Sequence, residues 1–231
     1  MRAGLSPAVA TCLLGLMPSG ALTATVSSTV ILTMDDDPQA TGWRLWEGGG
    51  GHVVRDGVLH IEAPSYYEFF APPEVWVDRV SNAKGWTVEA RLRRDPGSVG
   101  APGMWIDDDR YLTLFGLRED GLHLGDGSDF TGQYSIDTSM FHTYRFEGRQ
   151  NNLNVFVDDI LALSLEPVGP IGATFALAFG DNNAFASGTS ISEWDYVSVT
   201  TTAVPLPLGI WLLGSGLLAA VSLKWRPYRT S

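Results

Sequence analysis

Short segments in which apolar and polar residues alternate dominate the central part of the chain. The clearest is 86–93, where Trp, Val, Ala and Leu alternate with Thr, Glu and Arg. Successive side chains of a β-strand point to opposite faces of a sheet, so this pattern predicts a strand with one buried face. Leu153, Val155 and Val157 repeat the period. The alternation therefore favours an all-β domain.

Turn signals separate these segments. Asp56-Gly57 lies between the apolar runs 52–54 and 58–61, and Asp120-Gly121 and Asp126-Gly127 repeat the pair. Gly accepts the positive φ of a tight turn, so an Asp-Gly pair between two apolar runs predicts a β-hairpin. Further strand candidates share an apolar, aromatic or β-branched composition: 66–71, 103–107, 111–117, 141–148, 160–165, 174–180 and 191–200. About a dozen short strands predict a two-sheet sandwich.

The N-terminus has the layout of a secretory signal peptide. Arg2 precedes an uncharged stretch at 8–17, and small residues follow at 19–24. The uncharged stretch is shorter than the roughly 20 residues that cross a bilayer as a helix. We therefore predict that residues 1–24 are removed on export, with cleavage after Ala21 or Ala24.

The C-terminus predicts a membrane span. No charged residue occurs between Asp195 and Lys224, and residues 204–223 would cover about 30 Å as a helix. Lys224, Arg226 and Arg229 then form a basic stop, which favours keeping that end in the cytoplasm. Both ends of the chain thus predict one topology, with the domain anchored in the inner membrane and facing the periplasm.

A proline motif precedes this span. Val204, Pro205, Leu206 and Pro207 are followed by the apolar span and the basic stop, and this arrangement resembles the PEP-CTERM class of sorting signals in its VPLPA-like variant. The chain has no Pro-Glu-Pro, and Leu208 stands where the variant has Ala. The resemblance implies a Gram-negative bacterium, processing by the membrane enzyme exosortase, and passage to the cell surface or extracellular matrix. The prolines would hold the processed segment extended.

A second set of motifs lies between the two ends. Its members are Trp43 with 56–61, then 85–89, 141–145, 155–159, 179–181 and 194–197. The set resembles concanavalin A-like or laminin G-like jelly rolls and implies a two-sheet jelly-roll sandwich, although a fold alone does not give a function. The predicted organisation is a signal peptide at 1–24, a jelly-roll ectodomain at 25–202 and a sorting signal at 203–231.

The predicted ectodomain is acidic. Four of the 15 basic residues lie in the terminal segments, which leaves 11 basic against 26 acidic residues and a net charge of −15. This charge argues against nucleic acid as a partner. Acidic loops suit calcium, and the resemblance implies a structural calcium site, for which Asp35, Asp181 and Asn182 are the candidates. The only cysteine, Cys12, lies in the signal peptide, so the domain has no disulfide.

Catalysis has no clear residue set in the sequence. A glycosidase needs two carboxylates facing one sugar. Glu89 has arginines beside it, and Glu193 and Asp195 lie beside valines. The four histidines are scattered and form no metal-like pair. We therefore predict a non-enzymatic protein.

Aromatic residues gather in the middle of the domain and predict sugar binding, because sugars stack on exposed rings. The candidates are Tyr67, Trp76, Trp105 and Tyr134. Alternation places Tyr66 and Glu68 on the face opposite Tyr67 and Phe69. The predicted function is that of an exported, membrane-tethered surface protein that binds extracellular polysaccharide. A passive structural or adhesion module is the alternative, and a polysaccharide hydrolase is a more distant one.

Overall fold

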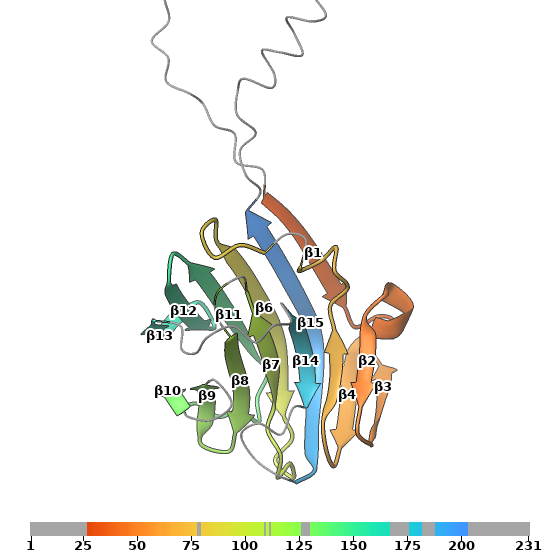
Figure 1. The fold of residues 1–231 in the computed structure, drawn as a ribbon. Coiled ribbons are helices and arrows are strands. Elements are labelled where there is room, and N and C mark those ends of the chain that lie inside the picture. Colours follow the sequence, from red (N-terminus) through yellow and green to blue (C-terminus); the bar gives the residue numbers. More distant parts are fainter. Residues whose placement is uncertain are drawn as a thin grey trace, which may run out of the picture. The chain divides into compact units, whose positions relative to one another are not determined.

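The computed structural model describes residues 27–77, 80–108, 110, 112–125, 130–166, 176–181 and 188–202. These residues form two antiparallel β-sheets that pack face to face, with one short 3-10 helix, η1, at Pro38–Thr41 (Figure 1). The predicted all-β, two-sheet sandwich is confirmed. The predicted signal peptide, sorting motif and basic stop lie outside these ranges, and within them no helix has the length and apolar character needed to cross a membrane.

Sheet A contains eight strands in the order β13-β12-β11-β6-β15-β4-β3, with β1 also paired to β15. β15 has 13 residues, so one of its sides can pair with both β4 and β1 while the other pairs with β6. The strands are β1 Ser27–Thr33, β3 Gly51–Arg55, β4 Val58–Ala63, β6 Trp86–Arg94, β11 His142–Arg149, β12 Asn152–Val157, β13 Ile160–Leu165 and β15 Ser190–Thr202.

Sheet B contains seven strands in the order β10-β9-β8-β7-β14-β5-β2. They are β2 Arg44–Glu47, β5 Tyr67–Phe70, β7 Pro102–Asp107, β8 Leu112–Arg118, β9 Gly121–Gly125, β10 Phe130–Tyr134 and β14 Leu177–Asp181. The seven further strand candidates of the sequence correspond to β5, β7, β8, β11, β13, β14 and β15. Consecutive strands are often in different sheets, so much of the pairing joins distant parts of the chain (Figure 1).

The core lies between the sheets and follows from the two-residue alternation. Along β6, every second side chain from Trp86 to Arg94 is buried. Phe179 on β14 meets three rings, with centroid distances of 5.2 Å to Trp43, 5.4 Å to Phe69 and 4.9 Å to Trp194. Burying a side chain of this size stabilises the fold by about 1.5–3 kcal/mol. These contacts hold β14 and β5 of sheet B against β15 of sheet A.

The Asp-Gly hairpin signals are confirmed where the structure describes them. Asp56 and Gly57 join β3 to β4, and both have positive φ, at 55° and 74°. The hairpin between β8 and β9 turns one residue earlier than predicted, at 119–120, and Gly121 opens β9 with a φ of 138°. The pair at 126–127 lies outside the described residues.

Two further hairpins turn without glycine. Gln150 and Asn151 join β11 to β12 with φ values of 49° and 65°, and Asp158 and Asp159 join β12 to β13 with φ values of 49° and 64°. Left-handed backbone is costly for residues with a Cβ, although Asn and Asp tolerate it best. Gln150 therefore carries the least favourable of these conformations.

Candidate functional site

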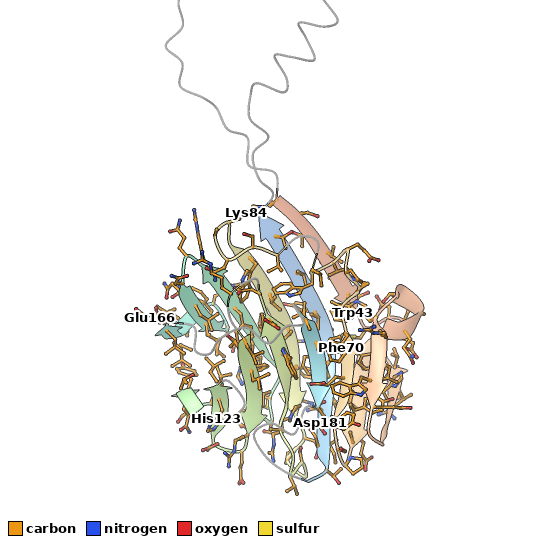
Figure 2. All side chains as sticks on the ribbon, viewed as in Figure 1. Trp43, Phe70, Lys84, His123, Glu166 and Asp181 are labelled. Atoms are coloured by element: carbon orange, nitrogen blue, oxygen red, sulfur yellow. The ribbon has the colours of Figure 1, made fainter. Side chains whose placement is uncertain are left out.

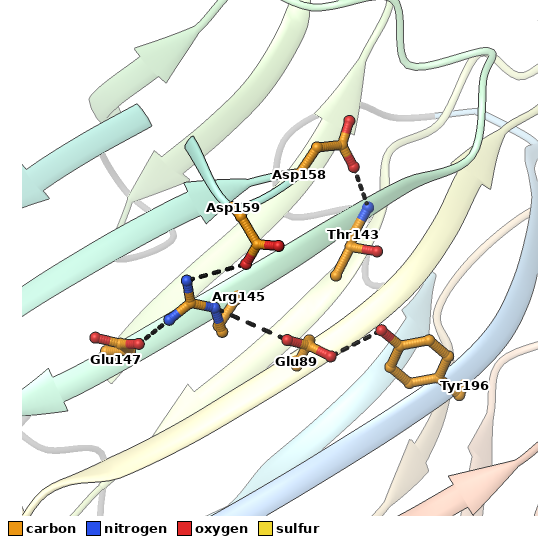
Figure 3. Close-up of polar contacts among 7 residues, drawn as sticks. All are labelled: Glu89, Thr143, Arg145, Glu147, Asp158, Asp159 and Tyr196. Atoms are coloured by element: carbon orange, nitrogen blue, oxygen red, sulfur yellow. Dashed lines mark hydrogen bonds and ion pairs between the residues drawn. The ribbon is translucent and has the colours of Figure 1, made fainter. Parts of the chain in front are cut away.

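The outer face of sheet A carries many charges, and they pair with one another (Figure 3). Arg145 on β11 contacts Glu147 on the same strand, Asp159 at 3.3 Å and Glu89 on β6 at 3.8 Å. The Tyr196 hydroxyl donates a 2.7 Å hydrogen bond to Glu89. Glu89 is thus held by two neighbours, as expected for a solvated strand face.

The carboxylates of β15 are also held by neighbouring side chains. Glu193 pairs with Arg93 at 2.8 Å and lies 3.4 Å from His60 Nδ1, and Asp195 pairs with Arg91. Glu193 and His60 also line a cavity of about 750 Å³ over β3, β4 and β15. Both carboxylates are engaged by arginines rather than directed at one shared position, so the geometry does not favour this pair as a hydrolytic centre.

The outer face of sheet B differs, because it carries a carboxyl group without a partner. Phe69 on β5 points into the core, so alternation directs its neighbour Glu68 to the outer face. Glu68 is nevertheless only 3% exposed, and it makes no hydrogen bond or ion pair with any described residue. Burial raises its pKa from 4.5 to about 7. Its cross-strand neighbours, Trp46 on β2 and Gly180 on β14, do not titrate.

Two glycines lie beside Glu68 in the same cross-strand row. Gly180 has a φ of 137°, and a Cβ built there would lie 2.1 Å from the Tyr67 carbonyl oxygen. At Gly103, the next position across the sheet on β7, a Cβ would lie 1.8 Å from the Phe115 carbonyl oxygen. A side chain is excluded at both positions. Both glycines are nevertheless buried, so this part of the outer face is not open to solvent.

A second unpartnered polar group lies on the other side of β14. Trp105 on β7 pairs with Ala178 on β14 and alternates with Ile106 of the core, so its indole lies on the outer face. Its Nε1 is buried and has no hydrogen-bond partner among the described residues. An unused acceptor, Glu68, and an unused donor, Trp105, thus flank β14. Buried polar groups are normally bonded, so the unbonded Nε1 of Trp105 is an exception on this face.

Exposed aromatic rings adjoin Glu68 at the β2 edge of sheet B. Trp46 is 51% exposed and Tyr66 is 37% exposed, and their ring centroids lie 4.8 Å apart. Phe70 on β5, labelled in Figure 2, lies 5.8 Å from Trp46. We call these three residues the aromatic platform. Phe70 also lines a cavity of about 350 Å³ together with Arg44 and neighbouring apolar residues.

The structure separates the four aromatic residues that the sequence suggested for sugar binding. Tyr67 is 2% exposed in the core and Trp76 is fully buried, with its Nε1 donating to the Asp107 carbonyl at 2.8 Å. Tyr134 packs against the core from β10. A ring without an exposed face cannot stack on a sugar, so Tyr67 and Trp76 are packing residues. Trp105 lies on the outer face of sheet B and is half-buried.

Trp46 and Glu68 are not among the site residues that the sequence predicts. The alternation in 66–69 correctly placed Tyr66 and Glu68 on the outward side and Tyr67 and Phe69 inward. The available signal was the apolar stretch 64–73 with a single acid inside it. That signal indicates an acid beside apolar residues, but it does not indicate which strands lie next to the acid in the fold.

The structure describes two of the three suggested calcium ligands. Asp181 is fully buried at the end of β14 (Figure 2), Asp35 is exposed after β1, and Asn182 lies outside the described ranges. No group of three or more His, Cys, Asp or Glu side chains in the described part of the chain could hold a metal ion. Here the histidines pair singly with carboxylates instead, as His52 does with Asp37 at 3.0 Å.

No family model and no curated protein matches the chain. Solved structures with a similar fold include a carbohydrate esterase of the Shiga toxin-encoding bacteriophage phi24B, at 10% identity and a TM-score of 0.53, covering 75% of this chain and 100% of the esterase. A lichenase from a mouse hindgut metagenome has 14% identity and a TM-score of 0.51, with coverage of 78% and 100%. An alginate lyase of polysaccharide lyase family 7 has 13% identity and a TM-score of 0.51, with coverage of 72% and 96%. These neighbours are carbohydrate-active jelly-roll proteins, which agrees with a concanavalin A-like domain.

The prediction of a non-enzymatic protein is contradicted by these similarities, because an esterase, a glucanase and a lyase share the fold. Two carboxylates on one strand are visible in a sequence, whereas the burial of Glu68 arises from tertiary packing. At 10 to 14% identity the likeness shows the fold alone. The fold therefore gives no ground for excluding catalysis, and it does not assign a reaction.

Proposed function

We propose that the domain interacts with polysaccharide through the outer face of sheet B. The observation that carries the proposal is the aromatic platform, in which Trp46 and Tyr66 expose their rings at the β2 edge of sheet B. A sugar presents apolar C–H faces that stack on aromatic rings, and hydroxyls that satisfy polar groups. The platform offers the rings, and Arg44, which lines a cavity together with Phe70, offers hydrogen-bond donors.

The aromatic platform supplies the stacking contact. Trp46 and Tyr66 lie close enough to form one continuous surface, and Phe70 extends it toward the Arg44 cavity. Exposed large rings cost free energy in water, so a cluster of them marks an interaction site more often than a single exposed ring does. A sugar ring stacked on the platform would lie over β2 and β5.

The proposal extends to where the domain acts. The signal peptide, the proline motif at 204–207 and the basic stop support an exported protein, tethered to the inner membrane until an exosortase-like enzyme processes it. Residues 25–202 would then face the periplasm and later the cell surface or matrix, where polysaccharide is available. The sequence of the two ends supports this part of the proposal.

Binding of oligosaccharides to the segment Thr25–Val204, which contains the whole core, tests the proposal by isothermal titration calorimetry. We expect Trp46→Ala to weaken binding about tenfold or more, since loss of a stacking ring removes a central contact. Ile160→Ala is the matched control, because Ile160 is 64% exposed on β13 of the other sheet. Equal affinity of wild type and the Trp46 variant, or no binding to any glycan, would overturn the proposal.

A further inference from the structure

The first and last strands of the domain come together at one end of the sandwich. Ser27, which begins β1, pairs with Thr202, which ends β15, and Figure 1 shows both strand ends at the same end of the sheets. The predicted span at 204–223 begins two residues after Thr202. Even a proline motif held outside the bilayer through Pro207 would reach at most about 18 Å. A membrane entered by this span would therefore lie beside this end of the domain.

Three exposed basic residues, Lys84, Arg110 and Arg149, lie at the same end, and we call them the basic patch. Lys84, labelled beside the end of β15 in Figure 2, precedes β6, Arg149 ends β11, and Arg110 lies between β7 and β8. A Cβ built at Gly85 would lie 3.4 Å from Arg149 Cδ, so the arginine packs beside the Lys84 loop. Arg110 Nη1 donates to Asn151 Oδ1, on the hairpin that follows Arg149, at 3.3 Å. The patch is thus one continuous surface built from three loops.

A buried polar network holds these loops together. Asn82 Nδ2 donates to Asp108 Oδ2 at 2.9 Å, and the Asn82 carbonyl accepts from the Gln150 N–H at 2.9 Å. The Arg110 N–H donates to Asp108 Oδ1 at 2.7 Å. The backbone that carries the patch is therefore fixed by the fold, and its three charges keep their arrangement.

The patch differs from the cations on the outer face of sheet A. Arg91, Arg93 and Arg145 pair with carboxylates there, whereas no residue of the patch forms an ion pair with any described residue. Glu74, in the loop after β5, and Glu166, at the β13 edge, are exposed acids on the same side of the molecule, and neither pairs with the patch. The positive charge of the patch is thus available to an anionic partner.

The opposite end of the sandwich is acidic. Asp95, Glu119, Asp120 and Asp137 follow β6, β8 and β10 at that end. β15 runs from one end to the other, and its 13 residues cover about 40 Å. This distance is several Debye lengths at physiological ionic strength, so the acidic end would not repel a surface that the patch contacts.

We propose that the basic patch binds anionic phospholipid headgroups and fixes the orientation of the tethered domain on the membrane. This inference rests on the membrane tether of the proposed function. Each Lys or Arg held near an anionic bilayer strengthens binding about fivefold, and the attraction acts within about one Debye length. The tether holds the patch near the headgroups, so these contacts form within one molecule and need no high affinity.

The orientation has a consequence for the carbohydrate face. The strands run from the patch to the acidic end, so a domain that contacts the bilayer with its patch places the strands upright on the membrane. The aromatic platform lies on the outer face of sheet B and not at the end that carries the patch. The platform would therefore remain clear of lipid and open to polysaccharide.

The experiment recreates the tether on the segment Thr25–Val204, which binds through a C-terminal polyhistidine tag to nickel-chelating lipid in vesicles. The vesicles consist of phosphatidylcholine alone or contain about 30 mol% phosphatidylglycerol, which makes the surface negative. The only cysteine of the chain is Cys12, so Ala83→Cys beside the patch and Val99→Cys at the acidic end each carry a single fluorescent label. A quencher on the lipid headgroups then reports which end contacts the bilayer.

We expect quenching at position 83 to be at least about twofold stronger on anionic than on neutral vesicles at about 50 mM salt, and equal on both at about 500 mM salt. Quenching at position 99 should stay low on both. The triple variant K84Q, R110Q and R149Q should lose the dependence on lipid charge. Arg55→Gln, at an exposed position on β3, is the matched control and should behave like wild type. Thermal unfolding confirms that each variant is folded.

The outcomes separate this inference from the proposed function. Equal quenching at position 83 on neutral and anionic vesicles, or in wild type and the triple variant, would overturn the lipid contact while leaving the tether in place. Alkaline extraction of the full chain from membranes tests the tether itself, and release of the chain would overturn the tether and this inference together. Oligosaccharide binding of the triple variant should equal that of wild type, and its loss would assign the patch to sugar rather than to lipid.

Discussion

Replacing Glu68 by Gln should stabilise the domain at high pH and leave it unchanged at low pH. Glu68 is 3% exposed, and burial raises its pKa from 4.5 to about 7. One pKa unit corresponds to 1.36 kcal/mol, so the ionised side chain destabilises the folded state by about 3 kcal/mol. Gln has nearly the same shape and no charge, so the variant lacks this destabilisation.

The sign follows from proton binding. Between pH 4.5 and about 7 the folded state keeps a proton on Glu68 that the unfolded state has released, so the stability contributed by this group falls as pH rises. The difference between the Gln variant and wild type should therefore be near zero at pH 4.5 and reach about 3 kcal/mol at pH 8. All other titrating groups are common to both proteins and cancel in the difference.

Thermal unfolding of Thr25–Val204 from pH 4.5 to 8 measures this difference. For a domain of this size, about 3 kcal/mol corresponds to a rise in Tm of roughly 6–12 °C at pH 8. Glu62→Gln, at an exposed position on β4, is the control and should show no such trend. A Tm difference for the Glu68 variant that stays constant across the pH range would refute the assignment of a buried, unpartnered carboxyl group.

Three other perturbations follow from the structure. His52→Ala should destabilise the domain by about 2–3 kcal/mol, because His52 Nδ1 lies 2.6 Å from the buried Tyr67 hydroxyl and links β3 of sheet A to β5 of sheet B. A double-mutant cycle with Tyr67→Phe, measured by urea unfolding, should show a coupling energy of about 1 kcal/mol. Additive effects of the two substitutions would contradict the link. Gln150→Gly should stabilise by roughly 0.5–1 kcal/mol, because its φ of 49° favours glycine, and a lower Tm would count against that reading. In a host with an exosortase, the wild-type chain should lose a C-terminal epitope tag, while the variant with Pro205 and Pro207 changed to Ala retains it. If both proteins keep the tag, residues 204–223 act only as a membrane anchor.

The strands of the core were predictable because their signal is local. The alternation along 86–93 reports which side of β6 is buried, and Asp56-Gly57 reports the positive φ of the β3–β4 turn. The turn at Gln150 and Asn151 has the same geometry but a sequence that does not require it. It forms because pairing of β11 with β12 and the bond from Gln150 N–H to the Asn82 carbonyl, at 2.9 Å, hold it in place.

The candidate site was less predictable because it depends on which strands become neighbours. Composition marked Trp46, Trp76 and Trp105 alike as large rings, yet one is exposed, one is fully buried and one is half-buried with an unused donor. The alternation of apolar and polar residues cannot distinguish the three rings, because it does not show which strands become neighbours. β14 lies between β5 and β7 in the sheet, although more than a hundred residues separate β5 from β14 in the sequence.

The position of Glu68 argues for function rather than packing. A Gln at this position would fill nearly the same space and would avoid about 3 kcal/mol of destabilisation above neutral pH. No described residue uses the carboxyl group as a bonding partner, so the folded domain gains nothing from its charge. Destabilising groups that persist in a well-packed sheet concentrate at binding and catalytic sites, where the ligand supplies the missing interaction.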